Sequence, residues 1–113
     1  MQVTRGEASG PVPVLRLEGD FDAFEADDLR KELAAIMTDK APSVILDLGD
    51  MTFANSTTIA CFISAQNRAT ELGGRIALAA PREFFRKTLT TLGLERVFSI
   101  HDDVAAAESE LGK

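Results

Sequence analysis

Asn55, Ser56, Thr57 and Thr58 place an amide and three hydroxyl groups directly before a long apolar-rich segment. Side chains of these types cap helices, because their oxygen atoms accept hydrogen bonds from the first backbone N–H groups, which lack partners within the helix. The helix dipole also places partial positive charge at this end, so an anion on Ser56 or Thr57 would be well tolerated there. The segment therefore has two interpretations, a plain helix cap or a phosphorylation site at Ser56.

The other reactive side chains, which are carboxylates, one cysteine and one histidine, show no spacing that indicates a metal site. Asp22, Asp47 and Asp50 are carboxylates, but their spacing matches no known metal-binding loop. The single Cys61 excludes an internal disulfide and a multi-cysteine metal site, and its place in an apolar helix predicts a small buried side chain. His101 has no suitably spaced ligand partner. The sequence therefore predicts no metal and no cofactor.

The sequence lacks the usual motifs of enzymes. There is no Gly-rich phosphate loop, and no Ser/His/Asp or Cys/His set has an interpretable spacing. We therefore expect a protein-interaction module that is not an enzyme. Arg82, Arg86 and Lys87 would form a small basic helix face, which is either solvated or a contact for phosphate or an acidic partner. A small-ligand or nucleotide-binding domain is a further alternative, supported by the helix N-terminus and Arg82 alone.

Composition limits the size and the partners of the protein. The chain has 113 residues, of which 45% are hydrophobic, so we expect one domain over residues 1–113. Its net charge of -6 argues against a nucleic-acid partner, which requires clustered Lys and Arg. The first residues lack the apolar core of a signal peptide, and no run approaches the length of a membrane span. We expect a cytoplasmic protein without membrane insertion.

A central strand is predicted at Val44–Leu48, which reads VILDL. Its apolar residues do not alternate with polar ones, as is typical of a parallel strand that is covered on both faces. Gly49-Asp50 is expected to end the strand, after which Met51 to Phe53 would return to the core. Asp47 is then expected near the carboxyl end of the strand, where it could line a functional crevice or, as we favour, accept a hydrogen bond from a loop N–H.

Strands and helices alternate along the rest of the chain. Asp22 and Glu25 have capping-box spacing, Gly73-Gly74 and Gly93 are helix stops, Pro81 suits the first position of a helix, and Asp102 is a helix cap. Apolar spacing places Phe85, Leu89 and Leu92 inward in the third helix. The expected strands are 2–7, 12–18, 44–48, 75–79 and 97–100, and the expected helices are 22–37, 56–72, 81–92 and 102–111.

This order of elements predicts an α/β fold. The first two strands would form a hairpin, and the later βαβ units would be right-handed. We expect a small mixed β-sheet with about four helices packed mainly on one face. Thr57, Thr58, Ala60 and Ser64 would form a surface of small side chains at the second helix, against which a partner domain could pack.

Five segments together resemble a known family. The central strand and the segment from Asn55 to Ile59 resemble the STAS domain of bacterial anti-sigma-factor antagonists. The resemblance spans essentially the whole chain, in order, and its further segments are Gly19–Asp22, Gly73–Leu78 and Leu92–Phe98.

The resemblance implies a phosphoacceptor and a partner-binding surface. Ser56 occupies the phosphoacceptor position, and Asp22, Asn55, Ser56, Thr57 and Thr58 fall on the partner-binding surface of the family. Asp22 could serve as a helix cap, as a partner contact, or as both. Asn55 stands where the family usually has Asp and Thr58 where it usually has Gly, so a negative charge is lost and bulk is gained beside the acceptor.

The resulting hypothesis is partner switching in transcription regulation, typically in a stress response. The unphosphorylated protein would bind an anti-sigma serine kinase and release the sigma factor, and phosphorylation of Ser56 would end that binding. A phosphatase would be a further partner. The alternative is a non-phosphorylated structural STAS subunit of a signalling scaffold or a transporter-associated complex. The sequence leaves open whether Thr57 or Thr58 is the acceptor, and whether the protein forms a homo-oligomer.

Overall fold

A five-stranded sheet forms the centre of the molecule in the computed structural model, which describes residues 2–6, 12–21, 25–37 and 43–111. The strands lie side by side in chain order, with β1 antiparallel to β2 and the other neighbouring pairs parallel. Within the described residues the strands are β1 (Gln2–Arg5), β2 (Val14–Phe21), β3 (Val44–Ala54), β4 (Ile76–Ala79) and β5 (Ser99–His101).

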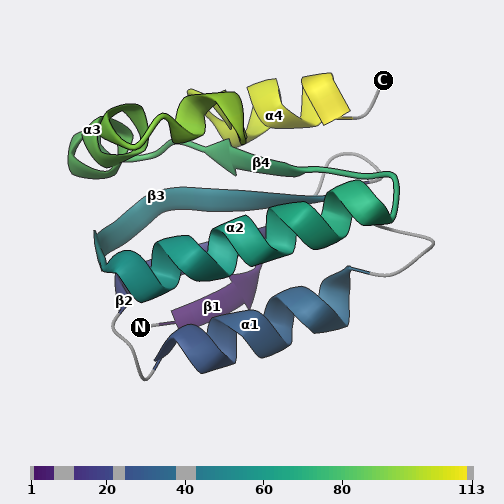
Figure 1. The fold of residues 1–113 in the computed structure, drawn as a ribbon, viewed down its shortest axis with the longest axis horizontal. Helices are drawn as coiled ribbons and strands as arrows, with labels where there is room; N and C mark the ends of the chain where they lie inside the picture. The colour runs from purple at the N-terminus through teal and green to yellow at the C-terminus, as the bar shows by residue number, and fades with distance from the viewer. Residues whose placement is uncertain (1, 7–11, 22–24, 38–42, 112–113) are drawn as a thin grey trace.

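Helices cover both faces of the sheet unequally. The described helices are α1 (Glu25–Ile36), α2 (Ser56–Glu71), α3 (Glu83–Thr91) and α4 (Val104–Leu111), with a short 3₁₀ turn η1 (Leu94–Arg96). Buried residues of α1, α2 and α3 belong to one core cluster, whereas α4 packs on the opposite face. Figure 1 shows α1 and α2 running side by side across one face of the sheet. The predicted α/β class, a small mixed sheet with about four helices mainly on one face, is confirmed.

The apolar run at the start of β3 is explained by burial on both faces. Leu46 and Leu48 belong to the core beneath α1, α2 and α3, and Ile45 belongs to the second cluster, beneath α4. All three side chains are completely buried. A strand in this position has no solvent face, so its sequence shows no polar alternation.

The prediction that Gly49-Asp50 ends this strand is wrong, because β3 continues to Ala54. The pairing with β2 shifts twice along this stretch, and each shift leaves one extra residue on β3. Such β-bulges let a strand continue through residues that would otherwise end it. At the first bulge Asp47 Oδ1 accepts a hydrogen bond from the Gly49 backbone N–H at 3.1 Å. Asp47 thus accepts a backbone N–H, as favoured, but the donor lies within β3 and not in a loop, and Asp47 itself lies inside the strand and not near its end.

The sequence predicted the end of α2 correctly and the start of α3 incorrectly. After α2, Gly73 has φ +88°, and the N–H groups of Gly73 and Gly74 donate to the carbonyls of Thr70 and Ala69, which is a Schellman motif. At the next helix the prediction is wrong at its start, since α3 begins at Glu83 and Arg82, not Pro81, precedes it as the N-cap.

The burial pattern of α3 is confirmed for Phe85 and Leu89, which are both 1% exposed, but it is wrong for Leu92. Leu92 is the C-cap of the helix and is 56% exposed. Gly93, in the left-handed conformation, turns the chain directly after it. The helical spacing that predicted burial therefore no longer applies at this residue.

The last helix is capped by a different aspartate from the one predicted. Asp103 Oδ1 accepts the Ala106 N–H at 2.7 Å, while Asp102 pairs with Arg86 at 3.2 Å. The preceding strand begins two residues later than expected, at Ser99, and ends at His101. The capping box expected at Asp22 and Glu25 lies outside the described residues.

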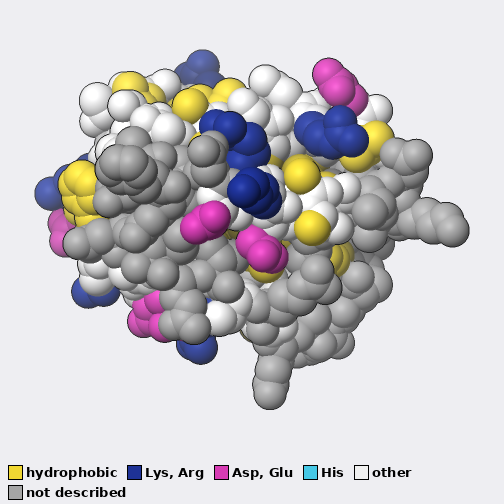
Figure 2. Space-filling view, turned by 90° about the horizontal axis from the view of Figure 1, so that it is seen from below, with side chains coloured by type: hydrophobic (Ala, Val, Ile, Leu, Met, Phe, Trp, Pro, Cys, Tyr) yellow, Lys and Arg dark blue, Asp and Glu magenta, His cyan; other side chains and the backbone are white. Residues whose placement is uncertain are grey.

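Charged side chains of both signs lie close together on the surface beside α1. The exposed positions of this helix include Asp28, Arg30, Lys31 and Glu32. Figure 2 views this side of the molecule and shows Lys and Arg side chains directly beside Asp and Glu side chains. Mixed charges of this kind are typical of a solvated helix face.

Candidate functional site

The N-terminus of α2 lies at the carboxyl edge of the sheet. Strands β2 to β5 are parallel, so their carboxyl ends meet at the same edge. Strand β3 ends at Ala54, and α2 begins two residues later at Ser56. Figure 1 shows this junction of β3 and α2 at the left of the molecule. Functional sites of open α/β sheets are commonly found at such an edge.

Asn55 is the N-cap of α2. Its backbone is extended, with φ -104° and ψ -177°, and its Oδ1 accepts the Thr58 backbone N–H at 3.0 Å. The Thr58 hydroxyl donates to the same oxygen at 3.2 Å. The capping interpretation of Asn55 is therefore confirmed, and the residue holds the first turn of α2 in place.

The three hydroxyl side chains have different surroundings. Thr58 is completely buried and Thr57 is partly buried, whereas Ser56 is exposed. The Ser56 side chain makes no hydrogen bond with any other described residue. The prediction that Thr58 lies on an exposed surface of small side chains is wrong, because its side chain is completely buried. Ala60 and Ser64 are exposed as predicted.

The electrostatic environment of Ser56 favours an anion. The first turn of α2 contains no acidic side chain, so the positive end of its dipole is not balanced from within the helix. The backbone N–H groups of this turn are also the usual ligands for phosphate at a helix start. A phosphate on Ser56 would thus lie where the helix attracts negative charge.

Phe53 lies close to this site in the sequence but was predicted to point into the core. The neighbouring Met51 is 1% exposed, as expected, whereas Phe53 is 48% exposed. The second bulge of β3 falls between these two residues and changes the direction of the following side chains. An exposed aromatic side chain three residues before Ser56 was therefore missed, because the sequence does not show the bulge.

The remaining carboxylates near this edge form ion pairs. Arg16 Nε lies 3.8 Å from Asp47 Oδ2 and 3.6 Å from Asp50 Oδ2. Among the described residues no group of three or more His, Cys, Asp or Glu side chains could hold a metal ion. Asp22, the third carboxylate considered and a predicted partner contact, lies outside the described part of the chain.

The basic face of α3 is largely paired with carboxylates. Arg86 lies 3.2 Å from Asp102, and Lys87 lies 3.4 Å from Glu83 one turn earlier in the helix. All four side chains are at least 46% exposed, so the pairs contribute little stability. This arrangement matches the solvated helix face that was one of the two predictions for these residues.

Cys61 and His101 are the remaining reactive side chains that the sequence singled out. Cys61 is 4% exposed, as predicted, and belongs to the core. The His101 Nε2 atom is 2.7 Å from the Ser99 hydroxyl on the same strand. Both observations are consistent with structural roles for these side chains.

Replacing Asn55 tests the cap directly. Asn55→Ala is expected to lower the free energy of unfolding by about 1 to 2 kcal/mol, since it removes the acceptor of the Thr58 N–H and leaves a buried hydroxyl without that partner. Asn55→Asp retains the acceptor oxygen and should be at least as stable as the wild type. Urea denaturation followed by circular dichroism measures both. Equal stability of the alanine variant and the wild type would contradict the role of the cap.

None of the described helices is both long enough and apolar enough to cross a bilayer.

The chain matches the model of the STAS domain over residues 5–107. It therefore belongs to the STAS domain family, as the resemblance indicated.

Solved structures of several relatives share the fold. An anti-sigma factor antagonist from Mycobacterium paratuberculosis has a TM-score of 0.86 and 19% identity, with 99% of this chain and 94% of that chain covered. The anti-sigma factor antagonist SpoIIAA in its unphosphorylated form has a TM-score of 0.80 and 19% identity, covering 99% and 98%. SpoIIAA of Bacillus in the phosphorylated form has a TM-score of 0.75 and 18% identity, covering 96% and 99%.

A transporter also contains a similar region. The murine Solute Carrier 26 family member A9 anion transporter has a TM-score of 0.74 and 12% identity, and the match covers 93% of this chain but 18% of that chain. At these identities the likenesses establish the fold and not the activity. The fold therefore occurs both as nearly the whole of small proteins and as part of a much larger one.

Proposed function

We propose that this protein is a non-enzymatic anti-sigma-factor antagonist that is controlled by phosphorylation of Ser56. Unphosphorylated, it binds an anti-sigma serine kinase through the start of α2, and the release of the sigma factor changes transcription. Phosphorylation ends the binding, and a phosphatase resets the cycle. The proposal places the cycle in the cytoplasm, where the kinase finds ATP.

The contrast among the three hydroxyls carries this proposal. A kinase must bring the γ-phosphate of ATP into line with an accessible oxygen, and Ser56 is the exposed one of the three. Thr58 is completely buried and its hydroxyl is bonded to Asn55. Thr57 is partly buried and is a weaker candidate. Membership of the STAS family supports the same role. Structures of the similar protein SpoIIAA in its phosphorylated and unphosphorylated forms support it as well.

The switch would act locally. Phosphorylation forms a bond between the Ser56 oxygen and the γ-phosphorus, breaks the bond to ADP, and adds nearly two negative charges. No hydrogen bond of Ser56 to another described residue is lost, and the phosphate would lie at the positive end of α2. The domain therefore keeps its fold, while the partner meets a new charge at the contact surface.

Intact mass measurement on protein purified from its own cells tests the modification. We expect a fraction of the wild type to carry one phosphate, Ser56→Ala to carry none, and Thr57→Ala to carry the same fraction as the wild type. The threonine variant is the matched control, since it removes the neighbouring hydroxyl. A phosphate that persists in Ser56→Ala, or one that is lost in Thr57→Ala, would contradict Ser56 as the acceptor.

A structural STAS subunit of a scaffold or transporter-associated complex is the second candidate. It is favoured by Asn55 and Thr58, which replace the Asp and Gly usual in phosphorylated family members, and by the likeness to part of a transporter. Under this alternative the wild type remains unmodified in its own cells. It also remains unmodified when it is incubated with ATP and a candidate anti-sigma kinase.

A further inference from the structure

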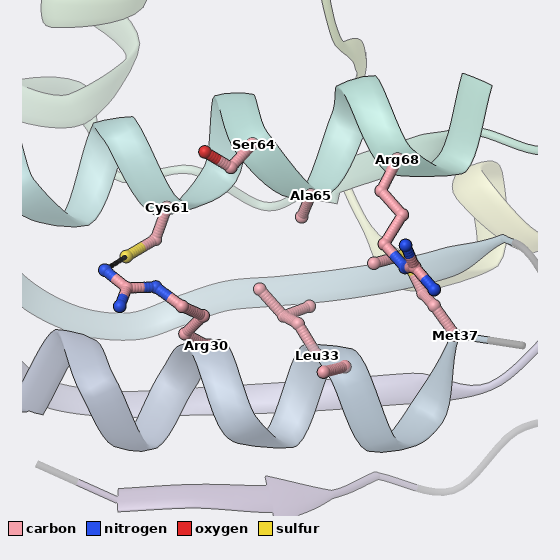
Figure 3. Close-up of a pocket in the computed structure, with 8 residues that line it drawn as sticks. Arg30, Leu33, Met37, Cys61, Ser64, Ala65 and Arg68 are labelled. Carbon is pink, nitrogen blue, oxygen red and sulfur yellow. Dashed lines mark hydrogen bonds between the residues drawn. The ribbon is translucent and has the colours of Figure 1, made fainter. Parts of the chain in front are cut away.

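A groove lies between α1 and α2, away from the start of α2. Its volume is about 100 Å³, and its floor is formed by Leu33, Met37, Cys61 and Ala65. All four of these side chains are buried. Small residues on both helices, Ala34 on α1 and Ser64 on α2, form part of the rim and leave the groove open. Figure 3 shows the two helices with this space between them.

Two arginines flank the apolar floor. In Figure 3 Arg30 extends from α1 toward Cys61, and Arg68 extends from α2 toward Met37, with Leu33 between them. Arg30 Nη2 lies 3.9 Å from Cys61 Sγ. Arg68 forms no ion pair with another described residue, although the chain as a whole carries a net charge of -6. The Arg68 end of the groove therefore offers a positive charge next to apolar surface.

We propose that this groove binds a small aliphatic carboxylate of about five or six carbons. Its alkyl part would replace water over Leu33, Met37 and Ala65, which is favourable for apolar surface. Its carboxylate would accept two parallel hydrogen bonds from the Arg68 guanidinium, the geometry that arginine provides best. Arg30 at the other end adds positive potential.

The volume limits the size of the ligand. A dry apolar cavity of about 150 Å³ holds benzene, so a groove of about 100 Å³ that is open on one side accepts a short or branched alkyl group and not a long acyl chain. On α2 the groove residues run from Cys61 to Arg68, which is 5 to 12 residues after Ser56, so a ligand in the groove and a phosphate on Ser56 occupy different places. The inference is therefore independent of the proposed function.

An NMR titration with 4-methylpentanoate tests the site. We expect saturable shifts of backbone amides at Leu33, Ala65 and Arg68, with a dissociation constant in the millimolar range, as befits so small a ligand. The matched probe 4-methylpentan-1-ol has the same alkyl group without the charge and should bind at least about fivefold more weakly. Equal binding of the alcohol would overturn the role of the arginines, and shifts confined to other residues would overturn the site.

A series of straight-chain acids tests the volume. From butanoate to hexanoate, affinity should rise by about fourfold for each added methylene, and octanoate should gain little more because its end reaches solvent. A continued fourfold rise at every methylene up to octanoate would contradict the limited groove. It would instead indicate a long-chain lipid site.

Three variants complete the test. Arg68→Gln should weaken 4-methylpentanoate binding at least about fivefold, whereas Arg96→Gln, which removes an exposed arginine outside the groove, should not. Ala34→Leu fills the groove from an exposed helix position and should abolish binding while the amide spectrum stays that of a folded protein. Unchanged binding in Ala34→Leu would show that the ligand lies elsewhere. If the free acids fail to bind at all, the groove is not a small-carboxylate site.

Discussion

Ser56→Glu is expected to weaken binding to the partner kinase by about 100-fold or more, whereas Ser56→Ala keeps binding within about threefold of the wild type. The reason is that a charge placed inside a contact surface loses its water without gaining a partner. The cost of burying an unpaired charge at an interface is commonly several kcal/mol, and each 1.4 kcal/mol is tenfold in affinity. The methyl group of alanine adds no such cost.

The kinase for this binding measurement can be captured by using the protein itself as bait. Immobilised Ser56→Ala, which is locked in the unphosphorylated state, should retain the kinase from a lysate of the native cells, and mass spectrometry then identifies it. Calorimetry with the purified kinase gives the affinities. Ser109→Glu is the matched control, because it makes the same change at an exposed serine of α4, on the opposite face of the sheet. If both glutamate variants bind like the wild type, the start of α2 is not the binding surface.

Phe62→Ala is expected to lower the free energy of unfolding by about 3 to 5 kcal/mol. The ring of Phe62 is completely buried and meets Phe85 of α3 edge to face, with the ring centroids 5.9 Å apart. It therefore joins two helices that have no direct chain connection other than through β4. Removing it leaves a cavity and also removes an aromatic contact worth about 1 kcal/mol.

Phe84→Ala is the matched control for this core substitution. Phe84 also packs edge to face against Phe85, with a centroid separation of 6.2 Å, but it is 38% exposed. Its replacement should cost about 1 to 2 kcal/mol, less than that of Phe62, because the ring is already partly exposed and its removal leaves no enclosed cavity. Urea denaturation of both variants measures the difference. Costs of equal size would contradict the central place of Phe62 in the core.

Sequence alone determined the class of fold and the position of the candidate site. The apolar residues of Val44–Leu48, which do not alternate with polar ones, specify a buried parallel strand. Gly73 specifies the end of α2, because few other residues adopt its backbone conformation. Asn55 specifies where α2 begins, since the cap uses only residues within one turn. These features are local, so the sequence carries them directly. Phosphorylation of Ser56 remains a prediction.

Tertiary structure decided what depends on pairing between distant segments. The bulges of β3 arise from its register with β2, and they expose Phe53 and carry the strand past Gly49. Burial of Thr58 depends on how α2 packs on the sheet, and this burial distinguishes Ser56 from its neighbouring hydroxyls. Two adjacent aspartates are equivalent caps in the sequence, and the fold assigns the cap to Asp103 because Asp102 pairs with a residue of α3.

The groove between α1 and α2 likewise could not be predicted from the sequence. Arg30 and Arg68 are 38 positions apart in the chain, and each is an ordinary exposed arginine when its own helix is considered alone. The packing of the two helices on the same sheet face brings both residues to one groove. A local pattern therefore predicts a helix and its caps, whereas a site built by two helices exists only once long-range packing has positioned both.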